Sequence, residues 1–148
     1  MIIQNILVPY EGSLMSKKAL ELGKEIALNF NATLNILMVV PLYSPINDSI
    51  YVGAMMTNYQ KIVKELTTQG EKNLSKVTEK CHEEGAKVSY KIVHDDVSNA
   101  ILKQAKKNKT DLIIMGSRRM KGLAAIKRIG STARYISEHA VCPVTIVH

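Results

Sequence analysis

Five short apolar segments, separated by stretches with helical periodicity, constrain the fold of this chain more than any other feature. The segments lie at residues 2–8, 33–40, 86–93, 111–115 and 144–147. They are rich in Ile, Val and Leu, and the first two stop at a proline, so each is predicted to be a strand. Because they read as apolar runs rather than as alternations, we expect strands that are buried on both faces.

Between these segments, apolar residues recur every three or four positions, which is typical of amphipathic helices. The first such stretch starts at Ser13, a plausible N-cap, and ends at the break 29–31. The others are predicted at about 58–84, 98–107 and 131–139. Residues 41–57 have no clear period and are predicted to be a loop. Four apolar or aromatic residues of this loop could form a lid, a partner surface or a packed loop, namely Tyr43, Tyr51, Met55 and Met56.

The order of elements, strand-helix repeated and closed by a strand, predicts an α/β fold. Short right-handed crossovers favour one doubly wound, five-stranded parallel sheet, in strand order 3-2-1-4-5, with helices on both faces. The 148 residues fit a single domain over 1–148, and no internal repeat or linker divides them.

Several classes of protein are disfavoured by simple counts. No apolar run reaches the ~18 residues that a membrane span needs, and the first residues lack a basic leader. Only two cysteines, Cys81 and Cys142, argue against a disulfide framework and for a reducing compartment. We therefore expect a cytoplasmic protein without a membrane partner.

The net charge of +7 is concentrated in the last third of the chain. Residues 1–96 carry a balance of −1 and residues 97–148 carry +8. Such asymmetry suggests an anionic partner, either nucleic acid or a phosphate ligand, although a solvated basic face explains it equally well. Five of the cations lie between Arg118 and Arg128, without an acidic residue among them.

In an open α/β sheet, ligands bind at the carboxyl ends of the strands, where the strand order reverses. The segments expected there are 9–13 and the residues that follow 115. Gly116 would let backbone approach a ligand, and Gly130 opens the last helix, whose free amides favour a phosphate. Neither a P-loop nor a G-x-G-x-x-G dinucleotide motif occurs in the chain.

The segments 6–13, 111–118, 130–131 and 142–147, taken in this order, carry a resemblance. Over essentially its whole length the chain resembles the universal stress protein family. Many members bind ATP through G-x2-G-x9-G-[S/T], with an Asp near the end of the first strand, and dimerise through the last strand. Here Glu11 stands in place of that Asp, Arg119 in place of the second glycine, and Gly116 and Gly130 are one position further apart than in the pattern.

The resemblance implies a set of nucleotide-binding residues and ATP as the ligand. The implied positions are Pro9, Tyr10, Glu11, Val39, Met115, Gly116, Arg118, Arg119, Gly130, Ser131, Thr132 and Ala133. Val39 and Met115 would contact an adenine ring, although strand-end core residues look the same. Glu11 could accept hydrogen bonds from ribose hydroxyls or hold Mg²⁺, or it could simply stabilise a helix start.

Other candidates point to structure rather than to chemistry. The run His94-Asp95-Asp96 could suggest a metal, but acidic turns before a helix are usually caps, so no metal site is predicted. Cys81 falls on the inward face of its helix and is predicted to be a small core residue. No catalytic residue is predicted, because no nucleophile and base can be paired from the sequence.

The function predicted is that of a homodimeric ATP-binding stress-response module. A nucleotide-free dimeric interaction protein is the alternative, and a slow ATPase or a nucleic-acid binder is less favoured. The dimer would form through Val144 to Val147, because an apolar edge strand is normally paired or covered.

Overall fold

The computed structural model describes residues 2–42, 52–117 and 129–148. In these ranges the chain forms five strands and four helices, which alternate along the chain and begin and end with a strand. The elements in chain order are β1 (Asn5–Pro9), α1 (Leu14–Phe30), β2 (Thr33–Pro41), α2 (Val52–Glu83), β3 (Lys87–Asp95), α3 (Val97–Lys107), β4 (Leu112–Gly116), α4 (Ser131–His139) and β5 (Val144–Val147).

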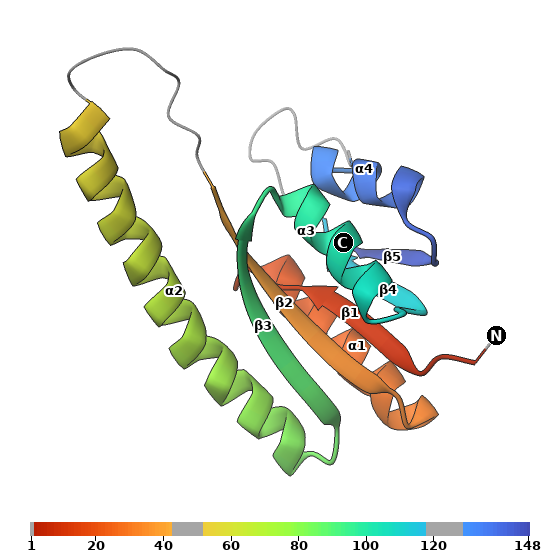
Figure 1. Cartoon of the computed structure of the whole chain (residues 1–148). Coiled ribbons are helices and arrows are strands. Elements are labelled where there is room, and N and C mark those ends of the chain that lie inside the picture. Colours follow the sequence, from red (N-terminus) through yellow and green to blue (C-terminus); the bar gives the residue numbers. More distant parts are fainter. Residues whose placement is uncertain (1, 43–51, 118–128) are drawn as a thin grey trace.

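All five strands are parallel and lie in the order β3-β2-β1-β4-β5, which confirms the predicted fold (Figure 1). The central strand β1 pairs with β2 on one side, in the register Asn5 to Thr33. On its other side it pairs with β4, in the register Ile6 to Leu112. The chain therefore reverses its direction of winding between β1 and β4, and this is the switch point predicted from the sequence.

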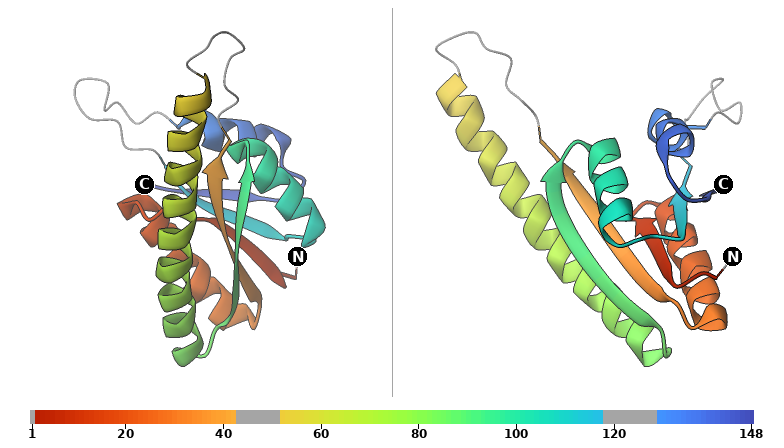
Figure 2. Two further views of the ribbon diagram at one scale, coloured as in Figure 1. Left: turned by 60° about the vertical axis from the view of Figure 1, so that its left-hand side comes forward. Right: turned by 45° about the vertical axis from the view of Figure 1, so that its right-hand side comes forward.

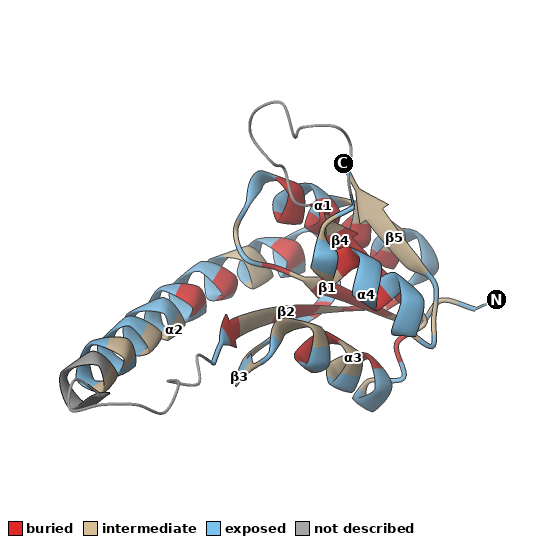
Figure 3. Cartoon of the chain, turned by 90° about the horizontal axis from the view of Figure 1, so that it is seen from above, coloured by how far each residue is buried: buried red, intermediate tan, exposed pale blue. Residues whose placement is uncertain are grey.

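Helices cover both faces of the sheet, and each face has its own apolar core. Ile6 and Val8 of β1 point to the cluster that packs under α1 and α2. Leu7, between them, points to the cluster under α3 and α4. All three side chains are fully buried, as expected for a central parallel strand. Figure 3 shows the sheet between these two layers of helices.

The helix α2 begins six residues earlier than predicted, at Val52 rather than near residue 58. The prediction was wrong there because residues 52–57 show no polar–apolar period. Alanine and methionine in this segment nevertheless have a high helix propensity, which favours the longer helix. The N-terminal part of α2 diverges from the sheet (Figures 1 and 2). Met56 is half-buried, whereas Tyr43, Tyr51 and the side chain of Met55 lie outside the described residues.

The first strand was predicted to begin at residue 2, but it begins at Asn5. The Asp111 carboxylate accepts hydrogen bonds from the amides of Gln4 and Asn5, at 2.9 Å each, and so occupies the end of the strand. Ile2 lies beyond this point and is 77% exposed. Asp111 itself was predicted to open β4, but that strand begins one residue later.

A buried lysine and two exposed carboxylates form an ion triad that joins α1 to the end of α2. The Lys24 ammonium lies 2.6 Å from Glu21 on its own helix and 2.5 Å from Glu84, just past α2. These two carboxylates raise the pKa of Lys24 well above its ordinary range. Cys81 lies close by and is buried, as predicted, and burial raises the pKa of its thiol.

Candidate functional site

The carboxyl ends of β1, β2 and β4 surround a pocket of about 560 Å³ on the α3 and α4 side of the sheet. This volume lies within the range of small-molecule sites. Its lining residues come from six elements and from the ends of β1 and β4: Pro9, Tyr10, Glu11, Ser13, Leu14, Met15, Leu37, Val39, Pro41, Val97, Ile101, Met115, Gly116, Ser117 and Thr132. The pocket therefore lies at the switch point of the sheet.

One wall of the pocket is apolar. Leu37 and Val39 from β2 meet Val97 and Ile101 from α3, and Met115 from β4 completes the wall. Val39 and Val97 are only half-buried, so their side chains present surface to the pocket. Such a wall offers contact to a flat apolar ring and no hydrogen bond from its side chains.

A carboxylate stands at the start of α1. Glu11 is exposed at the pocket and accepts a hydrogen bond from the Ser13 hydroxyl. The Ser13 oxygen in turn accepts from the Ser16 amide at 3.1 Å, which confirms Ser13 as the predicted N-cap. Among the lining residues that the structure describes, Glu11 is the only acidic one.

The start of α4 faces the same pocket, and no side chain caps it. Gly130 is the N-cap residue, and its carbonyl accepts the first helical bond, from the Arg134 amide at 2.9 Å. The amides of Ser131, Thr132 and Ala133 precede that bond and have no partner within the helix. Thr132 also lines the pocket. Amides and dipole at such a helix start attract an anion.

Gly116 lies at the end of β4, where the first turn of α1 packs against the strand. A Cβ at this position would lie 2.6 Å from the carbonyl carbon of Met15 and 2.8 Å from its oxygen. Contacts this short with backbone do not occur, so the close approach of α1 requires glycine here. The predicted reason for Gly116 was access of a ligand to backbone; helix–strand packing is a second and sufficient reason.

The structure brings seven of the twelve predicted site residues to the pocket lining: Pro9, Tyr10, Glu11, Val39, Met115, Gly116 and Thr132. Gly130 and Ser131 form the start of α4 without lining the pocket. Ala133 is turned into the core under α3 and α4 and is buried. Arg118 and Arg119, with the other three cations between 118 and 128, lie outside the described residues.

The pocket also includes residues that the sequence analysis did not assign to a site. Val97 and Ile101 belong to the helical period of α3 and read as ordinary core residues. Ser13 ends the segment 9–13 that was expected at this edge of the sheet, but as a single residue it was predicted only to be a helix cap. Pro41 was predicted to end a strand. The one signal that could have placed it here is its position two residues after Val39, because side chains two apart share a face of a strand.

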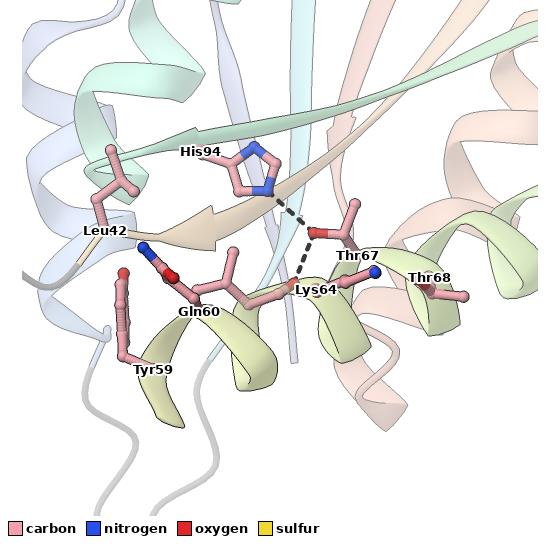
Figure 4. A pocket seen from close by; sticks show the side chains of 8 residues that line it. Leu42, Tyr59, Gln60, Lys64, Thr67, Thr68 and His94 are labelled. Atoms are coloured by element: carbon pink, nitrogen blue, oxygen red, sulfur yellow. Dashed lines mark hydrogen bonds between the residues drawn. The ribbon is translucent and has the colours of Figure 1, made fainter. Parts of the chain in front are cut away.

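A second cavity, of about 430 Å³, opens between α2 and the ends of β2 and β3 (Figure 4). His94 at its edge contacts the Thr67 hydroxyl through Nε2 at 2.9 Å, and that hydroxyl donates to the Val63 carbonyl at 2.7 Å. Because the single hydroxyl proton is directed to Val63, the imidazole Nε2–H is the donor to Thr67.

The two aspartates after His94 also have partners. Asp95 accepts from Lys103 Nζ and from the Asp96 amide, both at 2.8 Å, and Asp96 caps α3 by accepting from the Asn99 amide at 3.0 Å. The predicted cap is thus confirmed. In the part of the chain that the structure describes, no group of three His, Cys, Asp or Glu side chains could hold a metal ion. None of its helices is long and apolar enough to cross a bilayer.

Known proteins resemble this chain along its whole length. The model of the universal stress protein family matches residues 3–148. A universal stress protein of Bacillus subtilis is 32% identical over 146 residues, which cover 96% of this chain and 97% of that protein. One of Methanocaldococcus jannaschii is 31% identical over 145 residues, covering 97% of this chain and 81% of that protein.

Solved structures share the fold. The universal stress protein UspA of Lactobacillus plantarum superposes with a TM-score of 0.81 at 20% identity, over 100% of this chain and 99% of that one. A universal stress protein of Archaeoglobus fulgidus in complex with dAMP gives a TM-score of 0.69 at 18% identity, and the structure of a universal stress protein in complex with cAMP gives 0.61 at 21%. The first covers 100% of both chains, and the second 100% of this chain and 98% of that one. From the family match and the two sequence relatives, the chain belongs to the universal stress protein family.

Proposed function

We propose that this chain binds an adenine nucleotide, with ATP as the ligand, in the pocket at the switch point. The observation that carries the proposal is an apolar wall and an uncapped helix start that line one cavity of about 560 Å³. A nucleotide has the matching pair of ends, a flat base and an anionic phosphate chain. Relatives of the same fold whose structures were solved with dAMP and cAMP support the choice of adenine.

In this arrangement the base lies against Val39 and Met115, and the phosphates lie at the start of α4. The Glu11 carboxylate, next to β1, is then placed to accept hydrogen bonds from the ribose hydroxyls or to hold the Mg²⁺ that accompanies ATP. Glu11 is also the only base candidate among the described lining residues. Its carboxylate already accepts a hydrogen bond from the Ser13 hydroxyl, which favours binding over rapid hydrolysis.

Calorimetric titration with Mg-ATP tests the proposal, with two matched variants. Val39 and Val93 are neighbours in register, and both are half-buried on the α3 side, but only Val39 lines the pocket. Val39→Trp fills the cavity and is expected to abolish binding, whereas Val93→Trp is expected to retain it. The proposal fails if the unaltered protein gives no binding heat at millimolar Mg-ATP, or if both variants lose binding equally.

We also propose that the protein is a homodimer through β5. Within the described residues this strand pairs only with β4, and its four residues are half-buried. The carbonyls of Pro143 and Val147 accept from β4 and its extension at 3.0 and 2.8 Å. Because backbone groups alternate along a strand, those of Val144 and Ile146 point to the open edge, where a second copy can pair.

Ultracentrifugation of two variants at the same position tests the dimer. Ile146→Pro removes an amide that points outward, so it is expected to shift the protein to monomer. Ile146→Ala truncates the same side chain but keeps the amide, and it is expected to remain a dimer. Cytoplasmic location follows the family as an expectation, and fractionation of cells that produce the protein would check it.

A further inference from the structure

One buried hydroxyl in the lining of the pocket has no hydrogen-bond partner. Ser117, the residue after β4, is 8% exposed. Its amide donates to the Val147 carbonyl at 2.8 Å, so the backbone of β4 stays extended through this residue. Among the described residues, no group forms a hydrogen bond with the Ser117 hydroxyl. Native proteins normally pair such a group, because burial of a hydroxyl without a hydrogen bond is unfavourable.

The Ser117 side chain points into the pocket. Side chains alternate along β4, so Ile114 lies in the core under α1 and α2, whereas Met115 lies in the core under α3 and α4. Ser117 follows Met115 by two residues on an extended backbone, so its side chain shares the α3 and α4 face. The pocket lies on this face, and Ser117 is one of its lining residues.

The other buried polar side chains differ from Ser117. Ser16 donates to the Ser13 carbonyl at 3.0 Å, and Lys24 is bound by two carboxylates. The Thr110 hydroxyl has no partner within the described residues either, but it is fully enclosed and Thr110 does not line the pocket. Of these four buried polar residues in the described ranges, only Ser117 combines an unpaired hydroxyl with access to the cavity.

Ser117 lies one strand repeat beyond the wall that is proposed to hold the base. Met115 belongs to that wall, and two residues of extended strand span about 6.6 Å. Ala133, in the first turn of α4, packs in the same apolar cluster as Met115, and Thr132 of that turn lines the pocket together with Ser117. A ligand that spans the base wall and the start of α4 therefore has its middle part near Ser117.

We propose that Ser117 is a specificity-determining residue, whose hydroxyl donates to the phosphate next to the ribose and so selects nucleotides over nucleosides. The proposal rests on the proposed nucleotide binding and gives the phosphate chain a register, with the first phosphate at Ser117 and the outer phosphates at the start of α4. A hydroxyl that donates to a charged phosphate oxygen forms a stronger bond than a neutral pair does. Glu11, the only acidic residue in the described lining, accepts rather than donates and cannot take this role.

Calorimetry of Ser117→Ala with ATP, ADP, AMP and adenosine tests the assignment. The variant is expected to bind all three nucleotides about ten- to a hundredfold more weakly, by a similar factor, because each carries the phosphate next to the ribose. Its affinity for adenosine should be unchanged. Ser117→Cys keeps the shape of the side chain but offers only a weak donor, so its losses should be comparable.

Thr110→Val is the matched control, because it removes the other unpaired buried hydroxyl near β4 and leaves the pocket intact. It should bind all four ligands like the unaltered protein. Neither Ser117→Ala nor Thr110→Val should lower the Tm of the ligand-free protein, since loss of an unpaired buried hydroxyl is neutral or stabilising. A structural role for Ser117 would instead lower the Tm of Ser117→Ala and leave its affinities unchanged.

The pattern of losses separates this proposal from the proposed function. A loss for ATP and ADP but not for AMP would place Ser117 at an outer phosphate and overturn the assignment. An equal loss for adenosine would overturn it too, because adenosine carries no phosphate, and unchanged affinities for all four ligands would show that the hydroxyl makes no contact. Absence of binding of every nucleotide by the unaltered protein would overturn the proposed function itself, and the role of Ser117 with it.

Discussion

Two helices, α1 and α4, begin at the edge of the same pocket, and their first turns differ. The start of α1 is occupied by the chain itself, because the Ser13 hydroxyl accepts from the Ser16 amide and Glu11 binds that hydroxyl. The start of α4 has a glycine as its cap residue and no side-chain hydrogen bond. A third helix, α3, resembles α1 in being capped, there by Asp96.

The difference separates the helix that holds the fold from the helix that is open to a ligand. The first turn of α1 is pressed against Gly116, with a carboxylate beside it, so it is unsuited to an anion. Within the described residues, the first amides of α4 have no partner inside the helix, Thr132 of that turn lines the pocket, and the turn includes no acid. A bound phosphate would supply the cap that α4 lacks.

The largest effect is expected where α1 packs on β4. Gly116→Ala would place a methyl group 2.6 Å from Met15 backbone, so helix and strand must separate, at about 1–3 kcal/mol of unfolding free energy. Gly70→Ala is the control, because its Cβ would meet the flexible end of the Met38 side chain, which can turn aside. Urea unfolding measures both. Equal losses would show that α1 is not tightly fixed against β4.

The next effect concerns ligand affinity at α4. Gly130 has φ −59° and ψ 156°, which other residues adopt readily, so Gly130→Asp can supply a cap carboxylate to the free amides. Helix stability should rise by a few tenths of a kcal/mol, while the affinity for Mg-ATP should fall at least about tenfold through competition and repulsion. Gly130→Ala is the matched control and should keep its affinity. Calorimetry and thermal melting together would reveal whether the two quantities move in opposite directions.

The contrast between these helices also shows what could be predicted from the sequence. The strand order followed from the apolar runs, and it placed Pro9, Glu11 and Met115 at the pocket, because the carboxyl ends of parallel strands meet at one edge. Val39 was named as a site residue only from the resemblance to the family, because a core residue at the end of a strand looks the same. Ser13 and Asp96 were predictable as caps, since a cap acts within four residues of chain.

Contacts between distant elements were not predictable. Nothing near Gly116 in the sequence indicates that Met15 lies against it, and nothing near Gly12 indicates that Asn73 lies beside it. The early start of α2 was missed for a related reason, since residues 52–57 lie beyond the core that gives a helix its periodicity. Such contacts depend on how the helices pack on the whole sheet, and local sequence patterns do not specify that packing.

A smaller effect is expected at the cap of α1. Ser13→Ala removes the acceptor of the Ser16 amide and the donor to Glu11, which should lower the unfolding free energy by about 1 kcal/mol. Ser131→Ala, at the first position of α4, changes the same side chain where no cap bond exists and should leave stability within about 0.5 kcal/mol. If the two losses in urea unfolding are equal, the cap does not distinguish these helices.

The smallest effect is a dependence on pH at the start of α3. The hydrogen bond from Lys103, and then that from the Asp96 amide, hold the pKa of Asp95 below its ordinary value of 3.8. A carboxyl whose pKa is lower in the folded state stabilises the fold above its unfolded pKa, and this contribution is lost as the pH falls further. Stability should therefore decrease below about pH 3.8, less steeply in Asp95→Asn and to an intermediate degree in Lys103→Ala.

Urea unfolding at pH 7 and at pH 3 measures this slope, and Ser131→Ala provides the comparison. A hydroxyl does not titrate in this range, and the Ser131 hydroxyl binds no carboxylate among the described residues, so this variant should shift both stabilities by the same amount and leave the slope unchanged. If Asp95→Asn loses as much stability between the two pH values as the unaltered protein, the carboxyl does not support α3. The contrast between the capped helices and α4 would then rest on the Ser13 and Asp96 caps alone.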